Sequence, residues 1–345
     1  MLERYVNDAV DFTKALLAVD SPTGFTHEAA RYTLGALRDM GYAPVMTNKG
    51  GVAVEIGGKD KENAMLLSAH IDTLGGMVCR IKGNGRLQLT PLGGLRPNNC
   101  EGENCRIRTR DGKIYDGTFA LENPSIHVNV EYNDTKRSFD TCEVTVDEPV
   151  KTDGDVKKLG ICVGDVVFFD PRTRVTASGY IKSRFLDDKL SAGILLAFAK
   201  YIKETGVCPA QNLYLHFTVY EEVGHGASAM PAICKNVREV LAVDMGCVGE
   251  GLDCTERQVS ICAKDSAGPY SYEMVTKLIE SAKKAGADYA VDVYPHYGSD
   301  ADALLAGGAD LRHGLIGPGV FASHGYERSH VDGVKNTLGL LTGLI

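Results

Sequence analysis

Apolar residues recur at helical spacing in the first forty residues of the chain. One set runs from Val6 to Leu17, and a second set follows an SPTG turn at 21–24 and stops at Gly41. Residues three or four positions apart share one face of a helix, so these patterns predict two amphipathic helices. The same spacing returns in two later segments, at 191–206 and 273–286.

Short apolar runs between these segments predict buried strands. They lie at 51–56, 64–69, 212–219 and 240–244. Alternation of strand and helix signals is typical of an α/β fold, with a mostly parallel sheet covered by helices on both faces. The run at 64–69 is followed directly by His70, and open α/β sheets place their ligands at such strand ends.

The pattern changes in residues 75–170. Short β-rich runs follow one another here, separated by turn signals such as GNG and DG, and no stretch has convincing helical spacing. We therefore expect a compact all-β domain, inserted into an α/β domain formed by residues 1–74 and 171–345.

Composition and charge exclude some partners. The formal net charge is -8 and no run of Lys or Arg is long enough to track a phosphate backbone, so nucleic acid is not expected. The first twenty residues place acids among apolar positions, unlike a signal peptide or a membrane span, and predict a cytoplasmic protein without membrane contact. The ten cysteines contain no CxxC pair and are expected to be thiols.

Histidines and carboxylates stand at the predicted ends of strands and at turns. The candidates are His70 in SAHIDT, Asp187 in FLDDK, Glu221 and Glu222 in VYEEVG, Asp244 in AVDMG, and His324 in ASHGYE. Singly, an acidic pair or a histidine at a strand end is more often a solvated turn than a ligand. Several of these lie beside apolar segments, however, where a charge is costly unless it is paired or bound to a cation. Imidazole and carboxylate without thiolate suit zinc, manganese or cobalt, so the set predicts a metal centre.

The ordered motifs AHID, LDDK, YEEVG, VDMG and SHGYE resemble those of the glutamyl, deblocking and tetrahedral aminopeptidases. This resemblance covers nearly the whole chain and implies a phosphopeptidase-like α/β fold with an inserted β-barrel domain. It also implies an aminopeptidase that acts on short peptides through two divalent metal ions, zinc first and cobalt or manganese as alternatives. Relatives pair through the inserted domain and build dodecamers, so a homo-oligomer is expected.

The resemblance also implies a role for each motif residue. His70 and Asp244 would bind one metal ion, Glu222 and His324 the other, and Asp187 both. Glu221 would be the general base, and Asp72 would orient His70. Asp300, in the segment GSDAD, would lie near the substrate, although it could also cap a helix.

Some alternatives stay open. Asp188 could replace Asp187 as the bridging residue, and His330 could replace His324, which precedes Gly-Tyr here instead of the Ser-Pro that is common in the family. A metal-dependent amidohydrolase or deacylase acting on small N-acylated amino acids or dipeptides could use the same site. A catalytically silent assembly protein could retain the same fold. Nothing in the sequence marks the side chain that the enzyme prefers.

Overall fold

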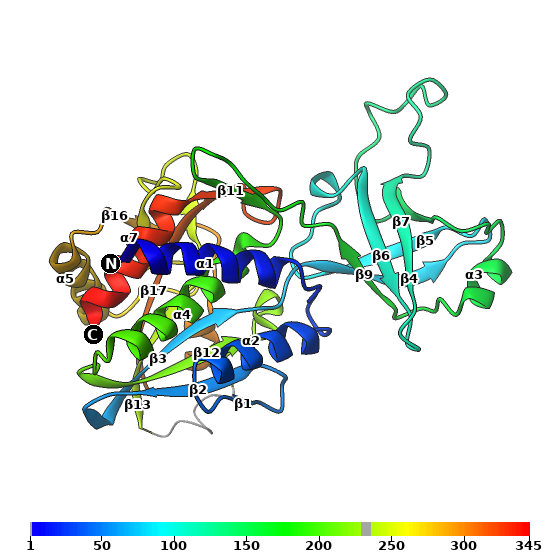
Figure 1. Cartoon of the computed structure of the whole chain (residues 1–345). Coiled ribbons are helices and arrows are strands. Elements are labelled where there is room, and N and C mark those ends of the chain that lie inside the picture. The colour runs from blue at the N-terminus through cyan, green and yellow to red at the C-terminus, as the bar shows by residue number, and fades with distance from the viewer. Residues whose placement is uncertain (1, 229–235) are drawn as a thin grey trace. The chain divides into compact units, whose positions relative to one another are not determined.

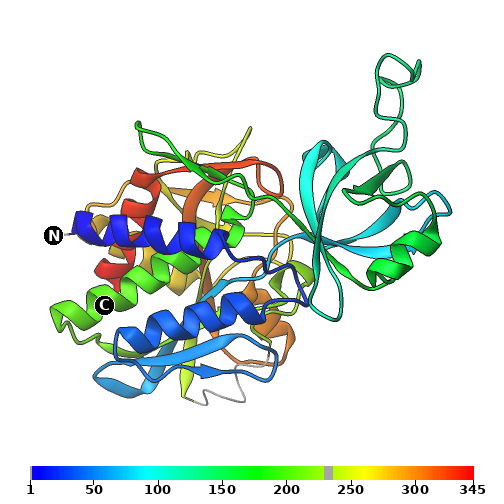
Figure 2. The same cartoon turned by 45° about the vertical axis from the view of Figure 1, so that its right-hand side comes forward.

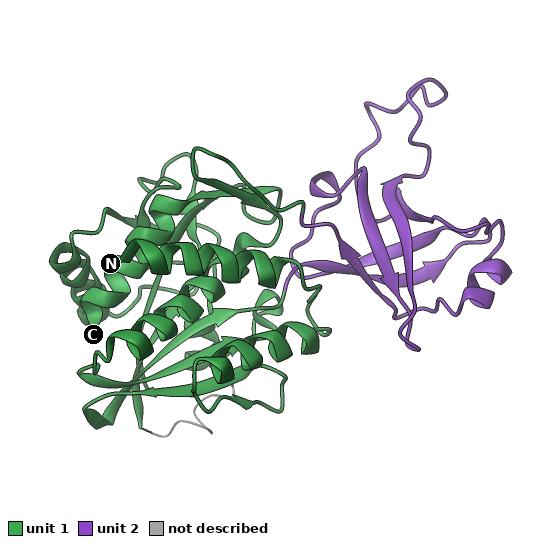
Figure 3. Ribbon diagram, in the orientation of Figure 1, with its two compact units in different colours: residues 1–72, 172–345 green, residues 73–171 purple. Residues whose placement is uncertain are grey.

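The chain folds into two compact units (Figure 3). The computed structural model describes residues 2–228 and 236–345. The larger unit comprises Met1–Asp72 and Arg172–Ile345, and the smaller comprises Thr73–Pro171. The smaller unit is therefore an insertion between two segments that fold together.

A twelve-stranded mixed sheet runs through the larger unit (Figure 1). Its centre is parallel, in the order β12 (Gln211–Thr218), β3 (Asp60–His70), β13 (Val237–Val243) and β17 (Arg312–Phe321). These strands are buried on both faces, which explains their continuous apolar runs. The predicted α/β fold is confirmed, with the parallel strands at the centre of the sheet.

Antiparallel strands complete the sheet on both sides of this centre. On one side lie β1 (Val45–Met46) and β2 (Val52–Gly57), and on the other β18 (Glu327–His330), β11 (Tyr180–Ser183) and β10 (Arg174–Val175). Three further strands complete the sheet. Strands β14 (Gly246–Val248) and β15 (Val259–Lys264) pair with β17, and β16 (Tyr289–Val293) pairs with β15.

Helices cover the sheet of the larger unit (Figure 2). Helix α4 (Leu186–Thr205) packs against α1 (Leu2–Leu17), α2 (His27–Asp39) and α7 (Val331–Leu344). Helix α5 (Tyr272–Ala285) packs against α7 and β15, and the short α6 (Asp300–Ala306) packs on β3, β13 and β17. None of the helices among residues 2–228 and 236–345 is both long and apolar enough to span a membrane.

The smaller unit is a closed antiparallel barrel. Its strands are β4 (Gly75–Ile81), β5 (Leu87–Leu92), β6 (Glu103–Arg108), β7 (Ile114–Leu121), β8 (Cys142–Val146) and β9 (Val166–Phe169). The barrel core is aromatic in part, since the rings of Phe119 and Phe169 meet edge to face at 5.7 Å. A short 3-10 helix, η1 (Pro97–Asn99), precedes β6.

The expectation that this segment contains no helix was wrong. Helix α3 (Asp153–Leu159) lies between β8 and β9. Thr152 and Asp155 form a capping box at its start, and Gly160 ends it in a left-handed conformation. With Val156 as its single buried side chain, the helix has no apolar periodicity to reveal it.

The nine cysteines within the described residues are free thiols, as expected. The tenth, Cys234, lies outside the described residues.

Candidate metal centre

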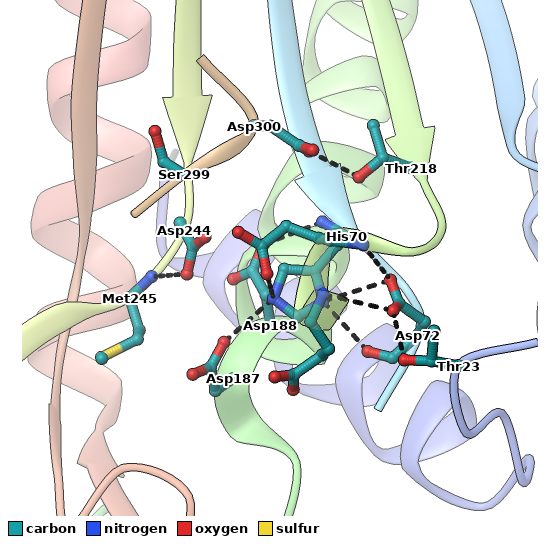
Figure 4. A network of polar contacts seen from close by, with 12 residues as sticks. Thr23, His70, Asp72, Asp187, Asp188, Thr218, Asp244, Met245, Ser299 and Asp300 are labelled. Carbon is teal, nitrogen blue, oxygen red and sulfur yellow. Dashed lines mark hydrogen bonds and ion pairs between the residues drawn. The ribbon is translucent and has the colours of Figure 1, made fainter. Parts of the chain in front are cut away.

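The predicted ligands lie at one edge of the sheet, and Figure 4 shows His70, Asp187 and Asp244 among them. Three of them stand at strand ends: His70 ends β3, Asp244 follows β13 and His324 follows β17. Glu221 and Glu222 lie in the 3-10 turn η2 (Glu221–Val223) after β12, and Asp187 is the second residue of α4. Because the central strands are parallel, their carboxyl ends lie together. The fold thus gathers residues from positions that are far apart in the sequence.

One group of buried side chains could hold a cation. His70, Asp187 and Asp244 each offer an atom within 4.8 Å of the others, and all three side chains are buried. The Nε2 atom of His70 lies 3.0 Å from Oδ1 of Asp187 and 3.6 Å from Oε2 of Glu221. These separations leave room for a cation held by imidazole and carboxylate groups.

A second group shares Asp187 with the first. The Nε2 atom of His324 lies 3.5 Å from Oδ2 of Asp187 and 3.6 Å from Oε2 of Glu222. The two carboxylate oxygens of Asp187 therefore face two different histidines. This second group is more open to solvent, since the His324 side chain is 38% exposed and that of His70 only 1%.

Negative charge is crowded in this site. Burial raises the pKa of Glu221 and Glu222 well above the usual value, and raises the pKa of Asp244 to about 7. Burial opposes the charged form of His70, but Glu221 and Asp187 outweigh it and raise its pKa. Without a cation, these buried groups retain protons.

A buried oxygen in the same site also points to a cation. The Oε1 atom of Glu222 is buried and has no hydrogen-bond partner. Leaving such an atom unsatisfied costs free energy, which a bound cation would recover. Together with the raised carboxyl pKa values, this atom shows that the residues present fit divalent cations.

Asp72 connects His70 to the turn that carries the two glutamates. Its carboxylate accepts hydrogen bonds from Thr23 Oγ1 at 2.7 Å and from the backbone N–H groups of Glu221 and Glu222 at 3.2 and 3.4 Å. The Nδ1 atom of His70 lies 3.0 Å from the backbone oxygen of Asp72 and 3.7 Å from its carboxylate. The backbone of Asp72 is thus the nearer group to the ring.

Of the two alternative ligands, His330 is engaged away from the site, whereas Asp188 lies beside His70 and its Oδ1 atom is buried without a hydrogen-bond partner. Asp188 accepts a hydrogen bond from the backbone N–H of His70 at 3.1 Å. His330 caps α7, because its Nδ1 accepts from the N–H of Asp332 at 3.0 Å and its Nε2 lies 2.8 Å from the oxygen of Ser178. Among the two histidines, His324 is therefore the one that faces the carboxylates.

Asp300 is the first residue of α6 and is not its N-cap. The N-cap of α6 is Ser299, which accepts a hydrogen bond from the N–H of Ala301. The carboxylate of Asp300 accepts from Thr218 Oγ1 and from the N–H of Ala227, and burial raises its pKa to about 6. It joins β12 to the segment after η2, and its contact with substrate remains a prediction.

The sequence analysis missed one buried glutamate beside the site. Glu327 accepts hydrogen bonds from the backbone N–H groups of Asp187 and His324. Burial, followed by the charge of Asp187, raises its pKa to about 8. The signal was its place at the end of the SHGYE motif, which drew attention only for its histidine.

The fold and this cluster define an α/β protein with a candidate metal centre. A family model described as M42 glutamyl aminopeptidase matches residues 50–340, so the chain belongs to this family. It is therefore an aminopeptidase, an enzyme that hydrolyses peptide bonds. Family membership favours an enzyme over the silent assembly protein that the sequence alone left open.

Similar proteins agree with this assignment. The chain is 41% identical over 336 residues to the putative aminopeptidase YhfE of Bacillus subtilis, covering 97% of this chain and 96% of the relative. It is 26% identical over 257 residues to the glutamyl aminopeptidase of Lactococcus lactis, covering 70% of each. A TET aminopeptidase from a Thaumarchaeota archaeon has the same fold, with a TM-score of 0.88, 20% identity and coverage of 98% and 96%. A chain of the PhTET1 dodecamer also has this fold, with a TM-score of 0.85 and 20% identity, covering 97% of this chain and 98% of that chain.

Proposed function

We propose that the chain is a dinuclear metallo-aminopeptidase that removes N-terminal residues from short peptides. In this proposal His70 and Asp244 hold one divalent ion, Glu222 and His324 hold the other, and Asp187 holds both. The observation that carries it is the position of Asp187, whose two oxygens lie 3.0 and 3.5 Å from the Nε2 atoms of two histidines. A single carboxylate shared in this way is suited to two adjacent cations.

The donor set suggests which metals fit. Imidazole and carboxylate groups accommodate zinc, cobalt and manganese, and we favour zinc with the other two as alternatives. When bound, such ions act as Lewis acids, polarising the peptide carbonyl and lowering the pKa of a water molecule.

Glu221 is the proposed general base. Its side chain is 14% exposed whereas that of Glu222 is 3% exposed, so the two neighbours face different surroundings. Glu221 would take the proton from the attacking water and return it to the leaving amine. A pKa raised by burial suits this role, because the base must also release the proton.

Recognition of the substrate's free amine would come from the carboxyl groups of the site. Glu221, Asp244 and Asp300 lie at this edge of the sheet and offer oxygen acceptors to an ammonium group. A protonated α-amine would be attracted to this region, whereas an acylated one would not. We therefore propose exopeptidase activity at the N-terminus.

The substitution Glu221→Gln tests the assignment of the base. It keeps the size of the side chain but removes its ability to accept a proton, so we expect kcat to fall by roughly 10² to 10⁴ while metal content stays unchanged. The exposed Glu250→Gln is the matched control and should keep wild-type turnover. Full activity of Glu221→Gln on aminoacyl chromogenic substrates would show that another group acts as base.

A pair of substrates separates aminopeptidase from amidohydrolase or deacylase activity. The same peptide would be assayed with a free and with an acetylated α-amine. Cleavage of the free form alone supports the proposal. Equal or faster cleavage of the acetylated form would instead favour the deacylase alternative.

We also propose that the chain forms a homo-oligomer through the inserted barrel. The similar structure of PhTET1 is a dodecamer. The similar TET1 peptidase of Pyrococcus horikoshii can assemble into a tetrahedron or a large octahedral shell. The barrel unit here carries exposed apolar side chains that favour a protein contact.

A further inference from the structure

Glu327 links the two segments that carry ligands of the second cation position. Its side chain is only 1% exposed. Its Oε2 atom accepts a hydrogen bond from the backbone N–H of Asp187 at 3.1 Å, and its Oε1 atom accepts one from the N–H of His324 at 2.9 Å. One carboxylate thus fixes the backbone of both residues.

The sheet explains why Glu327 can reach both segments. It is the first residue of β18, which pairs antiparallel with β11, and its partner in the register is Ser183. The chain leaves β11 at Ser183 and reaches Asp187 four residues later. The carboxylate of Glu327 therefore stands beside the start of α4, while its own strand follows the turn with His324.

The turn that carries His324 has an unusual backbone. His324 has a φ of 62° and Ala322 a φ of 58°, in the left-handed region that non-glycine residues seldom occupy. A hydrogen bond to the His324 N–H opposes relaxation of this turn toward ordinary conformations. The His324 side chain is 38% exposed, so neighbouring side chains enclose it less than they enclose His70.

The first cation position has separate supports. The backbone N–H of His70 donates to Asp188, and its Nδ1 atom lies 3.0 Å from the oxygen of Asp72. Asp244 is fixed by a hydrogen bond from the N–H of Met245 at 2.6 Å. Glu327 contacts this position only through Asp187, which both positions share.

We infer that Glu327 is a positioning residue for the second cation, the one held by Asp187, Glu222 and His324. This inference rests on the proposed dinuclear site. Glutamine at this position offers one acceptor oxygen and turns an amide N–H toward the other backbone N–H, so it can satisfy only one of the two donors. Loss of either bond frees a ligand segment of the second position.

The test is a cobalt titration of metal-free protein, followed by visible absorption and by competition with a chelator. The wild type should bind two equivalents. Glu327→Gln should retain the first equivalent and bind the second about 10- to 100-fold more weakly, the range found for residues that support metal ligands. Its activity should recover as the cobalt concentration rises.

A buried glutamate far from the ligands provides the control. Glu239, near the opposite end of β13 from Asp244, accepts hydrogen bonds from Lys277 Nζ at 2.8 Å and Gln211 Nε2 at 3.0 Å. Glu239→Gln should reduce stability to urea and leave both cobalt affinities unchanged. A general effect of losing a buried carboxylate is thereby separated from an effect on the second position.

Each outcome of the titration has a consequence. Wild-type affinity for both equivalents in Glu327→Gln, or equal weakening of both, would overturn the inference. If Glu327→Gln does not fold, Glu327→Asp replaces it, and unchanged binding of the second equivalent there would overturn the inference as well. Binding of fewer than two equivalents by the wild type would instead contradict the dinuclear site on which the inference rests.

Discussion

At the scale of single residues, the buried Asp265 and the half-buried Asp302 lie outside the candidate metal centre. Asp265 is fully buried and accepts a hydrogen bond from Tyr270 Oη at 2.6 Å. Asp302, at the start of α6, accepts one from the N–H of Ser299 at 2.9 Å. Burial, followed by the neighbouring Asp265, raises the pKa of Asp302 to about 7. Burial and the neighbouring carboxyl group thus both favour the protonated form of Asp302.

This pair predicts a pH dependence of stability. The pKa of Asp302 rises from 3.8 to about 7 on folding, so the folded chain binds more protons than the unfolded chain between these values. The contribution of Asp302 is therefore full below about pH 4 and is lost as the pH rises through about 7. Asp302→Asn mimics the protonated form, and we expect it to match the wild type at pH 5 and to exceed it at pH 8. The gain should be about 1 kcal/mol, allowing for partial solvent exposure.

Urea unfolding of the metal-free proteins at pH 5 and pH 8 measures this difference. The exposed Asp310→Asn is the control, and its stability should follow that of the wild type at both values. A wild type and an Asp302→Asn variant that differ by the same amount at pH 5 and pH 8 would contradict the raised pKa of Asp302.

At the scale of elements, close packing of α1 on α4 depends on one glycine. A Cβ atom at Gly193 would lie 2.2 Å from Thr13 Oγ1 and 2.8 Å from the backbone oxygen of Ala9. Gly193→Ala should therefore separate the two helices and cost about 1–3 kcal/mol in unfolding free energy. Gly35→Ala in α2 meets nothing within 4 Å and should add about 0.5–1 kcal/mol.

We expect the urea midpoint to fall for Gly193→Ala and to rise for Gly35→Ala, relative to the wild type. If Gly193→Ala were as stable as Gly35→Ala, the contact between α1 and α4 would have to be looser than the structure shows.

The elements also show what a sequence can reveal. The helices at 191–206 and 273–286 and the strand ending at His70 were predicted within a few residues, because apolar spacing records which face is buried. Strand β17 was missed because its sequence, RHGLIGPGVF, is rich in glycine and contains proline. A Cβ atom at Gly317 would lie 1.9 Å from the backbone oxygen of Asp244, so the close approach of these two backbone segments requires glycine there. Glycine has low strand propensity, and the sequence therefore does not predict this strand.

The site was accessible from sequence only in part. Residue types at strand ends and the family motifs pointed to His70, Asp187 and Asp244, which the structure brings together. That the two oxygens of Asp187 face different histidines, or that Glu327 holds two backbone segments, depends on strand pairing between positions far apart in the chain. No local pattern records such pairing, and a buried glutamate looks like any other in a sequence.

At the scale of the whole molecule, the inserted barrel carries an apolar segment in its loop between β7 and β8. Ile126, Val128 and Val130 are 61%, 73% and 97% exposed. Single exposed apolar residues are common, but three at alternate positions favour a surface that another protein covers. The proposed homo-oligomer offers a second copy of this chain as that partner.

Replacement of two of these residues tests the assembly. The double substitution Val128→Asp and Val130→Asp places charges where the proposed contact excludes water, so light scattering should show a smaller species than the wild type. Turnover of a small aminoacyl substrate should change little, because no predicted site residue lies in this segment. Val163→Asp is the control: Val163 is 64% exposed on the same unit but outside the loop, and its mass should be that of the wild type. If the double variant has the mass of the wild type, the copies meet through another surface. If the wild type is itself a monomer of 37.1 kDa, the proposed oligomer is wrong and the catalytic proposal is unaffected.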